Sequence, residues 1–314
     1  MADSEQPTWN DTMRTVAEPL PLLTRAYYAS VMSVLQGMGA HGQWYQGWQQ
    51  YFYPPEKGPN IVKTYDIRQN LPVRPWYPFP TAITDVAALY VAAVDDESLP
   101  IDPARIAVTG FSAGGNLTLG LSQVDSVRNH PRAPPSAIAK RRQYKVGSSL
   151  GGIRAQRKDW ILGLAPIFDW AYIKVGTDLR DPLLSPYFAP RDHLPRHVFV
   201  IGAELDFLVC EAHQLALKLA GKQDDPRFNT VPGRPEPAAE MGKLELEDPR
   251  FAWEESDAQG RSVRWLLVPD QVHAFDVQVG RSVLGDEVGV KDAVLKTEAY
   301  VKLMGEWLLN KVWA

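Results

Sequence analysis

Hydrophobic positions along this chain follow two different spacings. Helices are predicted where apolar side chains recur every three or four residues, in 20–38, 43–51, 81–94, 113–127, 209–221 and 291–309. Strands are predicted where short apolar runs occur, in 60–67, 71–74, 105–109, 197–202 and 263–268, and 160–165 fits a strand or a buried helix. Strands separated by helices indicate an α/β protein with a mostly parallel sheet flanked by helices.

The chain divides into an N-terminal segment and an α/β domain, and the domain contains two segments of unusual composition. Residues 1–58 form a helical N-terminal segment, and residues 59–314 form the predicted α/β domain. Within that domain, 129–158 is polar and rich in Lys and Arg, and its few aromatic residues favour a solvated loop over a nucleic-acid patch. Residues 223–260 are rich in Pro, Gly and acidic residues, which predicts an insertion in the domain.

Composition and charge exclude several classes of protein. The 314 residues carry 33 Lys and Arg against 37 Asp and Glu, so a formal charge of −4 gives no field for nucleic acid. The single cysteine excludes an intramolecular disulfide, and no Cys/His group has zinc spacing. There is no membrane-spanning apolar run and no signal-peptide pattern, so we expect a cytoplasmic protein; the oligomeric state is not predicted.

The sequence Gly110-Phe111-Ser112-Ala113-Gly114 lies between a predicted strand and a predicted helix. A serine on such a turn is held in a strained conformation that projects its hydroxyl outward, as in a nucleophile elbow. We expect Gly110 and Gly114 to be required because a Cβ at either position would collide with the neighbouring strand or helix. An ordinary glycine-rich turn is the competing interpretation, and the spacing does not fit a dinucleotide fingerprint.

A nucleophilic serine needs a histidine as base and a carboxylate to hold that histidine. Where the serine lies on a nucleophile elbow, the acid follows the serine in the chain and the histidine follows the acid. Of the six histidines, only His273 comes after the last predicted strand. Asp206 follows the strand 197–202 and is the preferred acid, with Glu204 as the alternative. Cys210, on the next helix without a histidine partner, is interpreted as a packing residue.

These motifs resemble the α/β-hydrolase fold-3 family, the hormone-sensitive-lipase-like esterases that include relatives of arylacetamide deacetylase. The matching stretches are 77–85, 106–117, 181–186, 202–206 and 272–275. The resemblance implies a serine hydrolase that cleaves small-molecule carboxylic esters of short or medium acyl chains and needs no cofactor or metal. Its triad would be Ser112, Asp206 and His273, the Ala113 N–H would serve the oxyanion, and the N-terminal helices would be a cap.

One family element is missing from the sequence. The family has a His-Gly-Gly-Gly segment that supplies most of the oxyanion hole, whereas this chain passes from Arg74 directly to Pro75. At least about 30 residues are lacking at that junction, which suggests an internally deleted family member whose sheet has lost strands. His41-Gly42 is the only His-Gly in the chain and precedes the first predicted strand.

Two functions therefore remain open from the sequence. The first is a carboxylic ester hydrolase, with small-molecule or secondary metabolism as its setting. The second is a catalytically impaired protein of the same fold that binds a small molecule or a protein partner.

Overall fold

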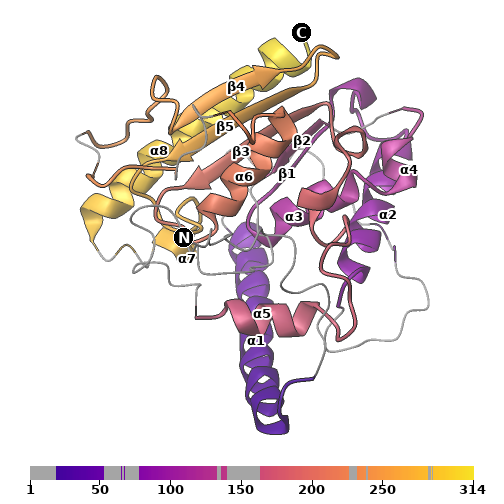
Figure 1. The fold of residues 1–314 in the computed structure, drawn as a ribbon. Helices are drawn as coiled ribbons and strands as arrows, with labels where there is room; N and C mark the ends of the chain where they lie inside the picture. Colours follow the sequence, from indigo (N-terminus) through magenta and orange to yellow (C-terminus); the bar gives the residue numbers. More distant parts are fainter. Residues whose placement is uncertain are drawn as a thin grey trace, which may run out of the picture.

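The computed structural model describes residues 19–52, 65, 67, 78–132, 136–139, 163–225, 232–237, 240–281, 284 and 286–314. Its α-helices are α1 (Leu22–Phe52), α2 (Thr81–Asp95), α3 (Ala113–Leu121), α4 (Asp125–Arg128), α5 (Ala165–Tyr172), α6 (Val209–Ala220), α7 (Gln278–Arg281) and α8 (Glu287–Trp307). Its strands are β1 (Ala107–Gly110), β2 (Ser136–Ala139), β3 (His197–Ala203), β4 (Ala252–Ser256) and β5 (Ser262–Val268). The helices and strands alternate, which confirms the predicted α/β class (Figure 1).

The five strands form one sheet in the order β1-β2-β3-β5-β4. The first four strands of that order run parallel, and only β4 pairs antiparallel, with β5. Among the described residues β1 has a neighbouring strand on one side only. This arrangement agrees with the expected mostly parallel sheet of few strands.

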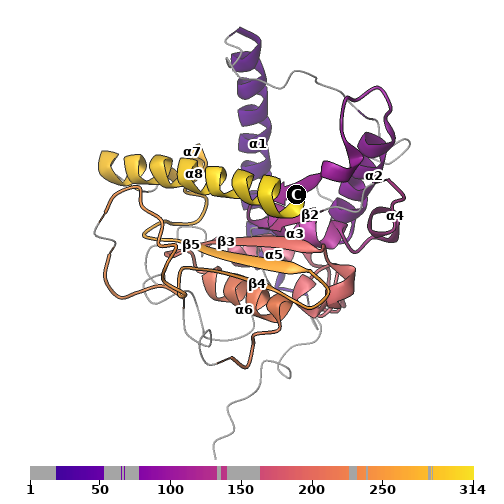
Figure 2. The same ribbon diagram turned by 90° about the horizontal axis from the view of Figure 1, so that it is seen from above.

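The two long inner strands are apolar on both faces because helices cover both sides of the sheet (Figure 2). Val198 and Val200 of β3 pack with Trp265 of β5 in the cluster that contains α6. Phe199 and Ile201, which point the opposite way, belong to the cluster that contains α8. The helices thus hold β3 and β5 rigidly, and the loops after these strands start from fixed positions.

Helix ends follow local sequence chemistry. Helix α6 stops at Gly221, whose φ of +66° is the left-handed conformation that glycine adopts without strain. Helix α8 begins after Asp286, whose side chain accepts a hydrogen bond from the Gly289 N–H at 2.6 Å. The end of α6 lies one residue from the predicted one, whereas α8 begins four residues before the predicted start at Lys291.

Several sequence predictions are corrected by the structure. The two N-terminal helices are one continuous helix, α1. The helix predicted over 113–127 is interrupted after Leu121 and resumes as α4. The segment 129–158 contains β2, which lies between β1 and β3 in the sheet, and 223–260 contains the edge strand β4. Helix α5 starts at Ala165, where the run 160–165 ends.

Some predictions lie mostly outside the described residues. The strand 60–67 is described only at Tyr65 and Ile67, neither of which is in regular structure there, and the strand 71–74 is not described. The domain boundary at 58 and the cap role of the N-terminal segment stay predictions. Helix α1 projects beyond the sheet and contacts α5, where the rings of Tyr28 and Trp170 meet edge to face at 5.9 Å (Figure 1).

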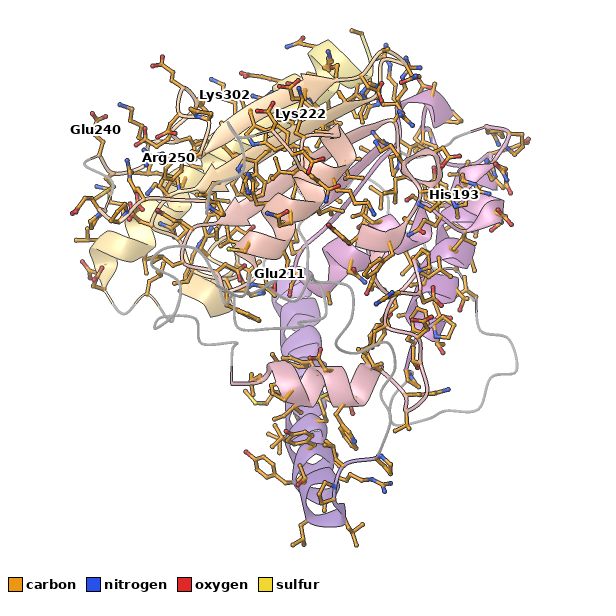
Figure 3. All side chains as sticks on the ribbon, viewed as in Figure 1. His193, Glu211, Lys222, Glu240, Arg250 and Lys302 are labelled. Atoms are coloured by element: carbon orange, nitrogen blue, oxygen red, sulfur yellow. The ribbon has the colours of Figure 1, made fainter. Side chains whose placement is uncertain are left out.

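The surface of the described residues carries mixed charge. In Figure 3 the side chain of Glu240 reaches outward at the edge of the molecule; it pairs with Lys243 at 3.2 Å. Lys302 and Glu306 lie one turn apart on the exposed side of α8, 4.0 Å from each other. No helix in the described ranges combines the length and the apolar character needed to cross a membrane.

Candidate active site

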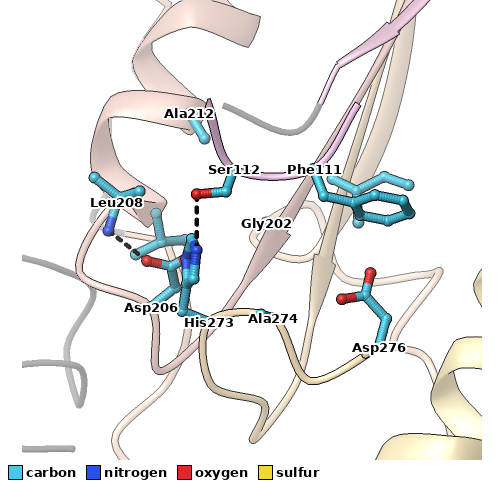
Figure 4. A pocket seen from close by; sticks show the side chains of 11 residues that line it. Phe111, Ser112, Gly202, Asp206, Leu208, Ala212, His273, Ala274 and Asp276 are labelled. Carbon is cyan, nitrogen blue, oxygen red and sulfur yellow. Dashed lines mark hydrogen bonds and ion pairs between the residues drawn. The ribbon is translucent and has the colours of Figure 1, made fainter. Parts of the chain in front are cut away.

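Three side chains singled out by sequence meet at one edge of the sheet. Ser112 follows β1, Asp206 follows β3, and His273 follows β5. Because the three strands are parallel, their carboxyl ends lie at the same edge, where open α/β sheets bind ligands. Figure 4 shows the three side chains converging from separate loops.

Ser112 sits on a strained turn between β1 and α3. Its φ is +52°, which is rare for a residue other than glycine. A Cβ placed on Gly110 would lie 2.2 Å from the Gly114 carbonyl oxygen, so only glycine fits at that position. Gly114 differs from the prediction, because a Cβ built there meets no described atom within 4 Å apart from the adjacent residues and the backbone of its own helix.

A chain of hydrogen bonds joins the three side chains (Figure 4). His273 Nε2 lies 3.0 Å from Ser112 Oγ, and His273 Nδ1 lies 2.8 Å from Asp206 Oδ2. The other carboxylate oxygen of Asp206 accepts the Leu208 N–H at 2.8 Å. With its proton on Nδ1, the imidazole donates to Asp206 and accepts the serine hydroxyl proton on Nε2.

The acid and the base are both buried. His273 is 5% exposed and Asp206 is 8% exposed. Hydrogen bonds in such a setting are stronger than in water. The arrangement can therefore hold the imidazole in one tautomer and stabilise its protonated form.

The space beside Ser112 is lined mainly by apolar groups. Phe111, on the same turn, is half exposed, and Ile201, Leu208, Val209 and Ala212 contribute the remaining aliphatic surface. The first residue of α3 is Ala113, and the first N–H groups of a helix have no partner within it. The N–H groups of Gly114 and Gly115 donate to the carbonyls of Phe111 and Ser112, so the Ala113 N–H, together with the helix dipole, is the group that favours negative charge next to the serine.

Two lining residues were missed by sequence reasoning. Phe111 stands between Gly110 and Ser112, so its place in the motif could have indicated it. Asp276 lies three residues after His273, and its carboxylate accepts the Tyr300 hydroxyl at 2.7 Å. Burial, assisted by the charge of Asp276, raises the pKa of Tyr300.

Glu204 and Cys210, the other acid and the other nucleophile considered from the sequence, make contacts of a different kind. Glu204, the second choice of acid, accepts backbone N–H groups of Arg234 and Asp270. Burial, and then the charge of Glu211, raises the pKa of the Cys210 thiol to about 12, and Cys210 packs against the α6 cluster. This agrees with its interpretation as a packing residue, because the reactive thiolate is suppressed.

The remaining histidines do not join this cluster. His41 lies within α1, so His41-Gly42 is not a loop that could replace the family's oxyanion segment. His213 is inside α6, and burial lowers its pKa to about 4. His130 pairs instead with Asp95, the last residue of α2, at 3.2 Å. The junction at Arg74 and Pro75 lies outside the described residues.

Comparisons with known proteins agree with this architecture. Residues 71–236, more than half of the chain, match a family model described as alpha/beta hydrolase fold. An arylesterase of Saccharolobus solfataricus is 31% identical over 150 residues, which are 46% of this chain and 48% of that protein. A Mycobacterium tuberculosis protein named as an acetyl-hydrolase is 29% identical over 119 residues, 37% of each chain.

The fold is also similar to that of solved esterases. The crystal structure of a variant of the esterase rPPE aligns with a TM-score of 0.50 at 16% identity, covering 75% of this chain and 60% of the other. The chain spans about half, or less, of the length of the two curated relatives that it matches.

Proposed function

The chain belongs to the α/β-hydrolase fold-3 family, and from that premise we propose that it is a serine esterase acting on small-molecule carboxylic esters. The observation that carries the proposal is the hydrogen-bonded series Ser112–His273–Asp206, built from loops after three parallel strands. A serine, a histidine and a carboxylate in this order and at these distances make an activated nucleophile.

In the proposed reaction, Ser112 Oγ attacks the ester carbonyl carbon while His273 Nε2 takes the hydroxyl proton. Asp206 holds the imidazole through Nδ1 and stabilises the imidazolium that forms. Collapse of the tetrahedral intermediate breaks the bond to the alcohol, which leaves with the proton from Nε2. Water, activated by the same histidine, then releases the carboxylic acid and regenerates the serine.

The oxyanion of each intermediate needs hydrogen-bond donors. In our proposal the Ala113 N–H is one donor, at the start of α3. Loss of a single donor typically lowers the rate by about 10² to 10³. A chain without the His-Gly-Gly-Gly segment is therefore expected to hydrolyse esters more slowly than family members that have it.

Short acyl esters are the proposed substrates. The names of the two relatives, an arylesterase and an acetyl-hydrolase, suggest acetate esters of aromatic alcohols. Apolar side chains beside the serine, Phe111 among them, suit such groups. Ester, lactone and thioester substrates share the tetrahedral oxyanion, so the triad alone selects none of them.

Hydrolysis of p-nitrophenyl acetate by the wild-type chain and by Ser112→Ala tests the proposal. We expect turnover by the wild type that Ser112→Ala reduces to the background rate. A fluorophosphonate probe, which reacts with activated serines, should label the wild type only. Equal hydrolysis by both proteins, together with no labelling, would reject the esterase.

A second candidate is a non-catalytic binding protein of the same fold. The missing oxyanion segment and the position of β1 at the edge of the described sheet favour it. Incubation with a nitrophenyl ester distinguishes the two candidates. A binding protein would bind a nitrophenyl ester with a dissociation constant that Ser112→Ala leaves unchanged and would release no nitrophenol.

A further inference from the structure

Glu204 is a fully buried carboxylate at the end of β3, two residues before Asp206. Both of its oxygens accept backbone hydrogen bonds: Oε1 from the Arg234 N–H at 2.9 Å, and Oε2 from the Asp270 N–H at 2.9 Å. Hydrogen bonds to a carboxylate are shorter and stronger than those between neutral groups. A buried charge is retained only where it has such partners.

The carboxylate connects the two loops that carry the acid and the base. Asp270 lies three residues before His273, in the loop after β5. The pairing of β3 with β5 continues into these loops, because the Glu204 N–H donates to the Val268 carbonyl at 3.0 Å. The Leu205 N–H then donates to the Gln271 carbonyl at 2.8 Å. The side chain of Glu204 adds a third connection across the same pair of loops.

Asp270 occupies a conformation that needs external support. Its φ is +58°, which is uncommon for residues other than glycine and is stable only where the surroundings enforce it. The N–H of this residue is the one that Glu204 accepts. The hydrogen bond therefore fixes the backbone at the point where the chain turns toward His273.

The other side of the same loop is anchored on α8. Lys296, 1% exposed, donates to the Pro269 carbonyl at 3.0 Å and pairs with Asp292 at 2.6 Å. Asp292 in turn accepts the side-chain amide of Gln271 at 2.6 Å. With α8 holding one side of the loop, the Glu204 carboxylate adds a side-chain bond to the backbone bonds that join the other side to the Asp206 loop.

Gly233 brings a second segment onto Glu204. A Cβ on Gly233 would lie 2.9 Å from Oε1, and the φ of this glycine is +99°. Only glycine allows the backbone of 232–237 to approach so closely. The region that the sequence indicated as an insertion thus helps to cover this carboxylate.

We propose that Glu204 is a positioning residue: from the Asp206 loop, its carboxylate holds the backbone of the His273 loop at Asp270 and so sets the distance between Asp206 and His273. This inference rests on the proposed esterase function for its kinetic consequence. Asp206 contacts the imidazole, whereas Glu204 acts on the backbone that presents it. A displacement of about 1 Å in such a group lowers the rate by about 10²-fold.

The variants Glu204→Gln and Glu204→Asp test the proposal. The amide offers one acceptor oxygen, and its NH₂ group would face a backbone N–H, so one loop loses its partner. The aspartate keeps the charge but is one methylene shorter and cannot reach both N–H groups. Asp257→Asn is the matched control: Asp257 also accepts two backbone N–H groups, of Gln259 and Arg261, but in the β4–β5 turn at the opposite end of β5.

Two readouts are needed. In p-nitrophenyl acetate hydrolysis we expect kcat to fall by about 10-fold to 10²-fold in the Glu204 variants, with KM unchanged. In proton NMR, the hydrogen-bonded Nδ1 proton of His273 should give a downfield signal in the wild type. This signal should be lost or broadened in the Glu204 variants and kept in the Asp257 control.

The NMR signal separates this inference from the proposed function, because it needs no turnover. If the wild type shows the signal but does not hydrolyse the ester, the esterase proposal is rejected. The signal in the Glu204 variants then still tests the positioning role of Glu204. Should Glu204→Gln not fold, Glu204→Asp carries both readouts. Wild-type kcat and an unchanged Nδ1 signal in a folded Glu204 variant would overturn the proposal, as would the same losses in Asp257→Asn.

Discussion

The two glycines that flank Ser112 should respond oppositely to alanine. A methyl group on Gly110 would lie 2.2 Å from the carbonyl oxygen and 2.3 Å from the carbonyl carbon of Gly114. It would also lie 2.7 Å from the Gly115 nitrogen. All three atoms are backbone, so no side chain can rotate away. Ordinary contact requires about 3.5 Å, and the turn must therefore move by about 1 Å.

From these distances we expect Gly110→Ala to destabilise the fold by about 1–3 kcal/mol, the usual range for overpacking. The same displacement moves Ser112 relative to His273 and should lower kcat by about 10²-fold. For Gly114→Ala, no described atom outside the adjacent residues and the backbone of its own helix lies within 4 Å of the added methyl group, and Gly114 is in helix α3. Alanine is favoured over glycine in helices by up to about 1 kcal/mol, so stability should be equal or higher.

Urea unfolding followed by tryptophan fluorescence measures both variants, since the chain has 10 tryptophans. Equal slopes for the three proteins would show that the midpoints report stability alone. Ester hydrolysis is measured on the same samples. If Gly114→Ala were destabilised as much as Gly110→Ala, the steric distinction between the two positions would be refuted.

Two further predictions concern the acid and a buried histidine. Asp206→Asn should keep the fold and lower kcat on the order of 10⁴-fold, because the amide favours the wrong imidazole tautomer; a rate within 10-fold of the wild type in nitrophenyl acetate hydrolysis would contradict this role. Burial lowers the pKa of His213 from 6.5 to about 4, so unfolding binds a proton between these values and stability falls as the pH drops from 6.5 toward 4. That difference corresponds to at most about 3 kcal/mol, which His213→Leu should remove; urea midpoints at pH 7.5 and pH 4.5 that fall equally in both proteins would exclude the contribution.

The sequence predicted the strands and loops that carry the candidate site because their signals are local. Strand β3 is a continuous apolar run, and such runs are typical of strands buried on both faces. The glycine-flanked Ser112 directly follows a strand, and His273 follows the last one. Parallel order then brings the loops to one edge without further information.

Elements that depend on distant pairing were not predictable in the same way. Strand β2 is only Ser136–Ala139, within a polar and basic segment, and it exists through its pairing with β1 and β3. Strand β4 is short and lies at the sheet edge, where it pairs with β5 alone. For such strands the neighbours, and not the intrinsic propensity, decide the conformation.

The role of Glu204 illustrates the same limit within the site. Both Glu204 and Asp206 follow β3, and the sequence ranks them only by position. The choice depends on which carboxylate lies 2.8 Å from His273 and which meets the backbone of the next loop. Both residues lie beyond the end of β3, where the regular alternation of a strand no longer fixes side-chain direction. Only the three-dimensional course of the loop therefore shows which carboxylate faces His273 and which faces the backbone.

The proposed triad and the family's oxyanion segment depend on different parts of the sheet. Ser112, Asp206 and His273 follow β1, β3 and β5, and β2 fixes the spacing between the first two of these strands. Strands on the side of β1 that has no neighbour among the described residues are not needed for that geometry, so a chain lacking them can keep the arrangement proposed to activate Ser112. The family's oxyanion segment would precede β1 in the chain, so its loss would remove donors without disturbing the hydrogen bonds among Ser112, His273 and Asp206. A slow esterase would keep enough N–H donors beside Ser112 to stabilise the oxyanion, whereas a non-catalytic binding protein would not. Fluorophosphonate labelling reports whether the serine is reactive, and turnover reports whether it hydrolyses esters efficiently.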